Sequence, residues 1–331
     1  MKLYTEVPIE PYPFKISYYD KLMFIGSCFT ENVGQKFKQY FFSTLINPFG
    51  VLYNPMSVAK ALEIIYLQEF FTPEMLEFAN GKWFSYYHHS RFSHSNRDEV
   101  LFSINKQISK AANFLKQTKY LFITFGTARV YRLKKTGKIV ANCHKQPSDL
   151  FERFLLTPEQ IINKYQKLIS ELRKYNPNLI IIFTISPIRH LKDGFFENNV
   201  NKSVLFLAIN ELLNIKDVYY FPSYEIVIDQ LRDYRFYSED LIHISPMAVN
   251  IIWEKISEAM IDSKSKNIFD EIIKIRKAYE HKPLDKNSSS YKQFIINTLN
   301  KIKQISQQMP NIDFSEVLEY FEKEFSLIDQ K

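Results

Sequence analysis

Three short apolar runs in this chain each end at a glycine, although its 331 residues contain only seven glycines. Gly26 follows KLMFI, Gly50 follows TLINPF and Gly126 follows KYLFITF. A glycine at such a place allows a tight turn or a positive φ that other residues avoid. Near-continuous apolar runs are typical of strands buried on both faces, so we expect these glycines to mark the carboxyl ends of parallel strands.

Helical patterns alternate with these runs and with two further candidate strands, residues 178–186 and 217–223. Asn54 and the proline after it predict the start of one helix, and Thr157 and Gln160 form a capping-box pattern at the start of another. The predicted helices cover residues 54–70, 157–176, 201–214 and 245–260. This alternation predicts an α/β fold, which we expect to be a three-layer α/β/α sandwich with strand order 2-1-3-4-5.

Two segments depart from this alternation. Residues 81–100 are aromatic, rich in histidine and without a clear period, so we expect an inserted loop region over one end of the sheet. After residue 262, polar linkers separate amphipathic segments. We therefore predict a main domain over residues 1–262 and a helical C-terminal extension over residues 263–331.

Composition excludes several classes of protein. The net charge of +7 comes from lysines interleaved with glutamates, without zinc-finger spacing or an aromatic RNA-binding motif, so we expect no nucleic-acid partner. Two cysteines are too few for a disulfide framework. The N-terminus lacks the apolar segment of a signal peptide, and no apolar run reaches the roughly 18 residues of a membrane span. We expect a cytoplasmic protein; the sequence leaves its oligomeric state open.

Ser27 and Cys28 follow Gly26, where the first strand meets a helix. The partial positive charge of a helix N-terminus favours an anion and lowers the pKa of a thiol, and its free N–H groups can stabilise an oxyanion. The position suits either side chain as a nucleophile, and it equally suits a small-residue turn with an inert cysteine. Asp240 and His243, three residues apart before the predicted last helix, could supply an oriented base.

Five stretches together resemble the GSCFA-domain family, which is related to the SGNH, or GDSL-like, hydrolases. They are GSCFTENVG, NPFGVLYNP, TFGTARVY, VANCHKQP and YSEDLIHIS. The resemblance covers residues 20–255 and implies a flavodoxin-like sheet and ester chemistry. We expect no cofactor and no metal. Read in register with the G-D-S-[LI]-[ST] block, Cys28 replaces the nucleophilic serine, whereas a shift by one residue would make Ser27 the nucleophile. The in-register match favours Cys28 because it also places Thr30.

The resemblance also implies oxyanion donors. Gly50 matches the oxyanion glycine after the second strand, and Gly126 matches the glycine of the third block, G-x-N-D. The asparagine of that block is missing here, and either Asn142 or the hydroxyl of Thr127 could replace it. Asp240 and His243 match the last block directly.

Several other polar residues are candidates for contact with a substrate. His88 and His89 lie in the irregular segment with His94, without the helical spacing of a zinc site, so a substrate-lining or surface loop is the better interpretation. His144, beside Cys143, suits a site or a packed turn. Arg129 and Arg189 follow predicted strand ends, where they could meet a substrate anion or remain solvated charges.

These observations predict an SGNH-like hydrolase that acts on a small-molecule or glycan ester. A carbohydrate O-deacetylase is one example of such an enzyme. If a sugar hydroxyl replaces water as the acceptor, the same site becomes a glycan O-acyltransferase. The alternative from another class is a binding module that keeps the fold without the activity, which the missing asparagine of the third block favours.

Overall fold

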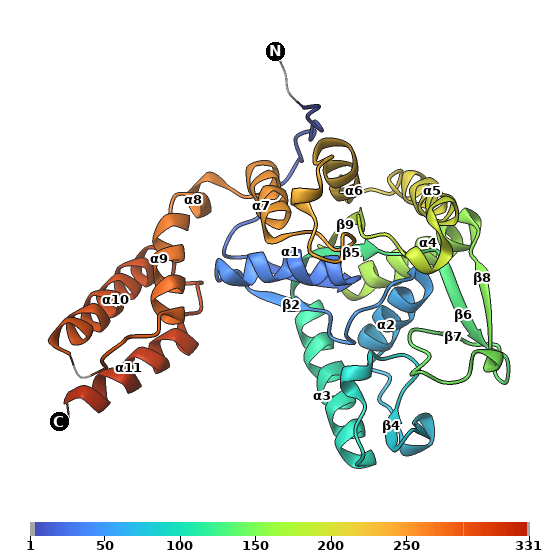
Figure 1. Ribbon diagram of the computed structural model, residues 1–331, viewed down its shortest axis with the longest axis horizontal. Helices are drawn as coiled ribbons and strands as arrows, with labels where there is room; N and C mark the ends of the chain where they lie inside the picture. The colour runs from blue at the N-terminus through green and yellow to red at the C-terminus, as the bar shows by residue number, and fades with distance from the viewer. Residues whose placement is uncertain (1–3, 287, 330–331) are drawn as a thin grey trace. The chain divides into compact units, whose positions relative to one another are not determined.

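A five-stranded parallel sheet forms the centre of the structure, a computed structural model that describes residues 4–286 and 288–329 (Figure 1). The strand order is β2-β1-β5-β9-β10, which confirms the predicted flavodoxin-like order 2-1-3-4-5. The strands are β1 (Lys21–Gly26), β2 (Thr44–Ile46), β5 (Thr118–Phe125), β9 (Ile180–Ile185) and β10 (Val218–Tyr220). β5 pairs in parallel with β9 from Tyr120 opposite Ile180 to Phe125 opposite Ile185.

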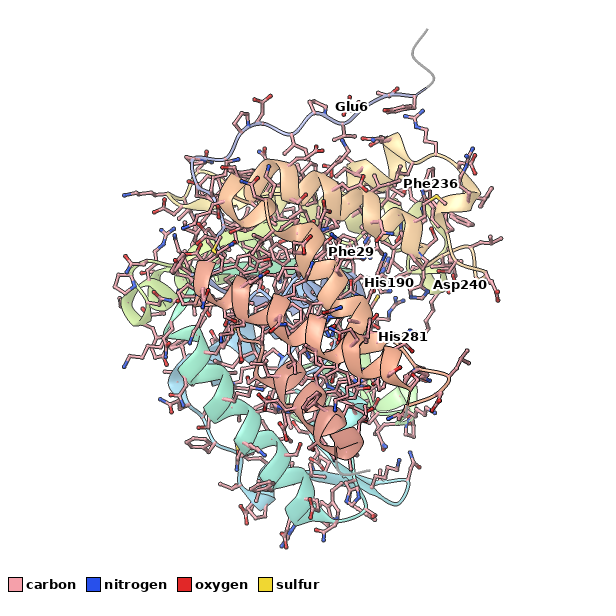
Figure 2. The ribbon with its side chains drawn as sticks, turned by 90° about the vertical axis from the view of Figure 1, so that its left-hand side faces the viewer. Glu6, Phe29, His190, Phe236, Asp240 and His281 are labelled. Carbon is pink, nitrogen blue, oxygen red and sulfur yellow. The ribbon has the colours of Figure 1, made fainter. Side chains whose placement is uncertain are left out.

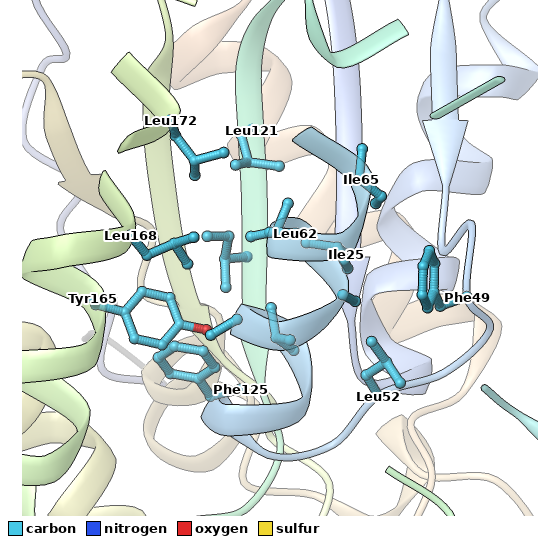
Figure 3. Packing of buried hydrophobic residues seen from close by; sticks show 14 of the residues in the cluster. Ile25, Phe49, Leu52, Leu62, Ile65, Leu121, Phe125, Tyr165, Leu168 and Leu172 are labelled. Atoms are coloured by element: carbon cyan, nitrogen blue, oxygen red, sulfur yellow. The ribbon is translucent and has the colours of Figure 1, made fainter. Parts of the chain in front are cut away.

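Helices cover both faces of this sheet. On one face, four helices pack in a single apolar core with the strands; they are α2 (Pro55–Leu67), α3 (Arg97–Leu115), α4 (Pro158–Tyr175) and α5 (Phe195–Leu212). Figure 1 shows α2 and α4 side by side, and Figure 3 shows Leu62 of α2, Leu168 of α4 and Leu121 of β5 in one cluster of buried side chains. On the other face, α1 (Cys28–Gln39) approaches β1 so closely that a side chain at Gly34 would collide with Ile46 and Phe24. These layers confirm the predicted α/β/α sandwich.

The predicted starts of two of these helices are confirmed. Asn54 caps α2 by accepting a hydrogen bond from the N–H of Ser57, with Pro55 as the first helical residue. Thr157 and Gln160 form the capping box of α4. Both signals are local, which is why the sequence reveals them.

Residues 81–100 are more ordered than predicted. They contain β4 (Lys82–Phe84), which pairs with β3 (Glu77–Ala79), and the first turns of α3, capped by Asn96. A second antiparallel sheet, absent from the prediction, is formed by β6 (Arg129–Leu133), β7 (Ile139–Val140) and β8 (Phe151–Leu155). Its strands are short and show only a weak alternation of apolar and polar residues, so they lack the continuous apolar runs of the central strands.

The chain divides into two compact units. The first comprises residues 1–9, 22–34 and 45–253, and the second comprises residues 10–21, 35–44 and 254–331. The described part of the predicted extension is helical, with α8 (Ser263–Lys266), α9 (Phe269–Glu280), α10 (Ser289–Gln308) and α11 (Ser315–Asp329). The division differs from the predicted boundary at residue 262, because earlier segments pack with these helices.

Within the second unit, aromatic contacts join residues 35–44 to the C-terminal helices. The ring of Tyr40 lies 4.4 Å from that of Phe269, and the ring of Phe41 lies 4.9 Å from that of Phe314. The guanidinium of Arg276 stacks 4.4 Å from the centre of the Phe41 ring. α7 (Pro246–Met260) crosses from one unit to the other, and the short helix α6 (Ser223–Glu225) belongs to the first unit. Within residues 4–286 and 288–329, no helix is both long and apolar enough to cross a bilayer.

Gly26 makes the tightest backbone approach at the end of β1. Its φ is +141°, and a Cβ atom at this position would lie 2.1 Å from the carbonyl oxygen of Thr124 on β5. The buried side chain of Asn47 accepts a hydrogen bond from the Gly26 N–H at 2.9 Å. These contacts fix the point at which α1 begins, so Gly26 is required both for its conformation and for its lack of a side chain.

We predict that Gly26→Ala lowers the free energy of unfolding by about 3 kcal/mol or more, because the new methyl group overlaps backbone atoms that have no room to move. Urea unfolding measures this change. The control is Gly137→Ala, at φ +68° with no atom within 4 Å of its added methyl group. That variant carries only the backbone penalty of about 1 kcal/mol, and equal losses in both variants would contradict the steric account.

Candidate active site

A cavity of about 450 Å³ opens where the carboxyl ends of β1, β5 and β9 meet. Six of the residues singled out from the sequence for chemistry or binding line it; they are Ser27, Cys28, Thr127, Arg129, Arg189 and, from the loop before α7, His243. A larger cavity of about 620 Å³ lies beside α2 and β7 and contains none of the predicted catalytic residues. The smaller cavity is therefore the candidate site.

Cys28 is the first residue of α1, and its thiol is partly accessible in this cavity. Burial raises the pKa of the Cys28 thiol, and the charge of Glu31 raises it a little further. The N–H groups of Phe29 and Cys28, which bond to the sulfur, and the charge of Lys202 act in the opposite direction without overcoming burial. The helix N-terminus lowers the pKa as expected, but the expected net pKa below that of an ordinary thiol is wrong, because desolvation is the larger effect.

Ser27 is less accessible than Cys28. The residue is 1% exposed, and its hydroxyl oxygen is buried without a hydrogen-bond partner among the described residues. Its backbone N–H donates to the carbonyl of Thr124 at 3.2 Å. Of the two candidate nucleophiles, the geometry favours Cys28.

Asp240 and His243 form a close pair. Oδ2 of Asp240 lies 2.5 Å from Nδ1 of His243, and Oδ1 accepts hydrogen bonds from the N–H groups of Ile242 and His243. The turn between them places Leu241 at φ +57°, an unusual conformation for a residue with a side chain. The hydrogen bonds from His243 and the backbone lower the pKa of Asp240 to about 2, so this carboxylate is ionised across the physiological range.

This pairing leaves Nε2 of His243 for the cavity, because Nδ1 is engaged by the carboxylate. Figure 2 shows Asp240 near the surface, in agreement with the half-exposed side chains of both residues. The carboxylate holds the imidazole in one orientation and favours the tautomer with its proton on Nδ1. The pair can therefore accept a proton from a group inside the cavity.

His190, which sequence reasoning did not select, also lines the cavity. Its ring meets the Tyr53 ring edge-on at 5.4 Å, and its Nε2 would lie 3.3 Å from a Cβ at Gly126. Burial and the charge of Lys202 lower the pKa of His190 to about 4, so it is neutral near pH 7 and a weaker base than an ordinary histidine.

Hydrogen-bond donors for an oxyanion are found at two places. The N–H groups of Cys28 and Phe29 already point at the Cys28 sulfur. Asn54 lines the cavity and uses Oδ1 to cap α2, so Nδ2 is its remaining polar group; no hydrogen bond among the described residues uses it. Its place after the second strand, close to Gly50 in sequence, is the signal that could have identified it.

The predicted oxyanion residues are only partly brought together. Gly50 donates its N–H to Asn47 and packs against His89, outside the cavity. Asn142 also lies outside the cavity, where its Oδ1 accepts from the N–H of His144. The N–H groups of Gly126 and Thr127 both donate to the carbonyl of Tyr53. Of the four predicted donors, only Thr127 lines the cavity.

Three predicted substrate-binding histidines lie elsewhere. His88 is fully buried, stacks on Phe49 at 4.2 Å and has a pKa lowered to about 3 by burial. His89 accepts a hydrogen bond from the N–H of Arg91, and His144 stacks on Phe84. None of the three lines the candidate cavity, and their contacts are those of packed residues.

No three His, Cys, Asp or Glu side chains gather as metal ligands within residues 4–286 and 288–329. Arg129, in contrast, lines the cavity as predicted. Its guanidinium pairs with Glu197, and its Nε lies 3.6 Å from Oδ2 of Asp193.

Lys202 is an unpredicted charge beside the cavity. It is 1% exposed, and its Nζ donates to the carbonyl oxygens of Gly126 at 2.7 Å and Ser186 at 2.6 Å. Among the described residues, no carboxylate lies within ion-pair distance of it. Burial lowers the pKa of Lys202 to about 7, whereas its interaction with Cys28 raises that pKa. Each of these two groups therefore favours the charged form of the other.

We predict that Lys202→Met raises the pKa of Cys28 further, because it removes a cation that stabilises the thiolate. The rate of alkylation by iodoacetamide, followed by mass spectrometry of the Cys28 peptide as a function of pH, measures this pKa. The pH at which alkylation of Cys28 reaches half of its maximal rate should be higher in the wild type than for an ordinary cysteine. In the variant this midpoint should be higher still.

Cys143 provides a crossed control. Burial raises the pKa of Cys143 and the charge of Lys192 lowers it. Lys192→Met should therefore raise the midpoint of Cys143. Lys202→Met should leave the midpoint of Cys143 unchanged, which would show that this variant is still folded. An unchanged Cys28 midpoint in Lys202→Met would show that Lys202 has no electrostatic effect on Cys28. Its amine would then serve only to link the carbonyls of Gly126 and Ser186.

A solved structure is similar to this chain. An acetyl xylan esterase from the rumen bacterium Butyrivibrio proteoclasticus is similar in structure, with a TM-score of 0.35 and 12% sequence identity. The match covers 77% of this chain, which spans 66% of the esterase chain. No curated protein matches the sequence.

Two family models match the sequence itself. The model described as the GSCFA family matches residues 21–256, and the model described as the C-terminal domain of GSCFA domain proteins matches residues 272–326. The first match contains every residue that lines the candidate cavity. The chain belongs to the GSCFA family.

Proposed function

We propose that this protein transfers acyl groups from esters, with Cys28 as the nucleophile and water as the usual acceptor. Support comes from one observation above all: an accessible thiol at a helix N-terminus lines the same cavity as a histidine oriented by a carboxylate. A thiol, a base and a group that orients the base are the parts of a nucleophilic site. On this proposal the protein is an SGNH-like hydrolase with cysteine in place of serine.

In the first step, Nε2 of His243 accepts the thiol proton as the Cys28 sulfur attacks the ester carbonyl carbon. A base is needed because burial raises the pKa of this thiol and keeps it protonated near pH 7. The C–S bond forms, and the negative charge on the carbonyl oxygen is stabilised by the N–H groups of Cys28 and Phe29 and by Nδ2 of Asn54. His243 then gives its proton to the leaving alcohol as the C–O bond breaks.

In the second step, the same histidine activates water. Nε2 of His243 accepts a proton from water as its oxygen attacks the thioester carbonyl. The C–S bond then breaks, the acid leaves and the proton returns to the sulfur. Throughout both steps Asp240 stays ionised and stabilises the imidazolium, which its low pKa allows.

If a sugar hydroxyl replaces water in the second step, the protein is a glycan O-acyltransferase. The first step is identical, so the two activities differ only in the acceptor. One observation supports the other alternative, a binding module without activity: the predicted oxyanion residues Gly50 and Asn142 do not line the cavity. Turnover of a simple ester that depends on His243 would eliminate the binding module.

We predict that the protein hydrolyses p-nitrophenyl acetate and that Cys28→Ala lowers kcat by about 10³-fold or more, because it removes the covalent route. His243→Ala should lower kcat by about 10²- to 10⁴-fold through loss of the general base. Release of p-nitrophenol under saturating ester measures both effects.

Ser27→Ala is the matched control, since it changes the neighbouring residue of the same turn. The Ser27 hydroxyl is buried, so we expect its removal to change kcat by less than about tenfold. Full activity in Cys28→Ala together with an inactive Ser27→Ala would move the nucleophile to Ser27. Full activity in both variants would exclude covalent catalysis at this turn.

A further inference from the structure

The candidate cavity carries an excess of positive charge. Four arginine and lysine side chains line it, and Asp193 is the only carboxylate among its described lining residues; the cations are Arg129, Arg153, Arg189 and Lys192. Asp240 is not among the lining residues, and its carboxylate faces Nδ1 of His243. A cavity with charges of one sign attracts a ligand of the opposite sign.

Two of these cations are already neutralised. The side chain of Asp193 is 2% exposed and pairs with Arg153. Arg129 pairs with Glu197 and lies 3.6 Å from the same aspartate. The carboxylates near this part of the cavity are therefore committed to the protein's own arginines, which leaves Arg189 and Lys192 to be considered.

Arg189 and Lys192 lack such partners. In the part of the chain that the structure describes, no carboxylate lies within ion-pair distance of either side chain. The Arg189 guanidinium lies 6.0 Å from the centre of the Phe195 ring, and Nζ of Lys192 lies 3.3 Å from the Tyr131 hydroxyl. Both residues follow β9, lie on either side of His190 in the sequence and line the same cavity as Cys28 and His243.

Lys202 is a third cation with no carboxylate within ion-pair distance among the described residues. It is buried and donates to the carbonyl of Ser186, which lines the cavity. The charge of Arg189 lowers the pKa of Lys202, so the two cations are close enough to repel each other. Repulsion between cations destabilises the empty site, and a bound anion would relieve it. The planar guanidinium of Arg189 matches the two oxygens of a carboxylate.

We propose that Arg189 and Lys192 form a subsite for a negatively charged group, so that the substrate of this enzyme is an ester with a carboxylate close to the ester bond. An acidic glycan that contains acylated uronic acid residues has this chemistry, whereas a neutral acylated sugar does not. This assignment of substrate class rests on the proposed acyl transfer, but the anion subsite itself can be tested without any turnover.

Iodoacetate and iodoacetamide provide that test, because they have similar size and alkylate the same sulfur but only iodoacetate is charged. We expect the ratio of their rates at Cys28, iodoacetate over iodoacetamide, to fall about fivefold in Arg189→Met, the size expected for loss of a partly buried ion pair. Arg189→Lys, which keeps the charge, should retain most of the ratio. About 1 M salt should also reduce the ratio, since it screens charges beyond roughly 3 Å.

Arg173→Met is the control variant, since it removes an arginine of α4 that bonds to the Lys216 carbonyl away from the cavity. It should leave the ratio at Cys28 unchanged, and the ratio at Cys143 should stay the same in Arg189→Met. A ratio at Cys28 that is unaffected by Arg189→Met and by salt would overturn the anion subsite, as would an equal fall in Arg173→Met.

The substrate class is tested with two esters of similar shape, 4-acetoxybenzoate and 4-acetoxybenzamide. We expect kcat/KM for the anionic ester to exceed that for the neutral ester, and the preference to fall about fivefold in Arg189→Met. Equal kcat/KM values would overturn the substrate class. If neither ester is hydrolysed, the proposed function fails, and the alkylation ratio still decides whether the anion subsite exists.

Discussion

The close approach of Gly26 to the Thr124 carbonyl is the constraint on which the candidate site depends. It brings the end of β1 against β5, and the hydrogen bond from Gly26 to Asn47 ties the same point to the segment after β2. α1 can then begin at Cys28, with its first N–H groups directed at the sulfur. One backbone contact thus fixes the nucleophile and its oxyanion donors together, before any substrate is bound.

Opposing effects act on the pKa of the Cys28 thiol. Burial in a cavity among packed strands raises the pKa of the thiol, whereas the helix N-terminus and Lys202 lower it, and burial is the larger effect. A resting thiol rather than a thiolate explains why an oriented base is needed in the same cavity. The unpaired cations Lys202, Arg189 and Lys192 then favour each negative charge that forms or binds there, whether a thiolate, an oxyanion or a substrate carboxylate.

Much of the fold follows from the sequence, because the central strands coincide with near-continuous apolar runs and the helices start with strong caps such as Asn54 and Thr157. The β6–β8 sheet and the α3 helix were missed, since the first lacks apolar runs and the second lies next to an irregular segment. Within the site, local motifs located Cys28 and the Asp240–His243 pair. Lys202 and His190 were missed as site residues because tertiary packing brings them to the cavity, whereas Asn54 was missed although its place after the second strand signals it. The same packing takes His88, His89 and His144 away from it.

Covalent capture of the acyl group tests the central claim most directly. His243→Ala slows removal of the acyl group from the thioester as well as its formation, so prolonged incubation with p-nitrophenyl acetate should leave part of the protein acetylated. Peptide mapping by mass spectrometry at acidic pH, where thioesters survive, then identifies the modified residue. The account predicts one acetyl group on Cys28, removable by neutral hydroxylamine and absent from Cys28→Ala. Acetylation of Ser27 instead, or the absence of any adduct from an enzyme that still hydrolyses the ester, would contradict it.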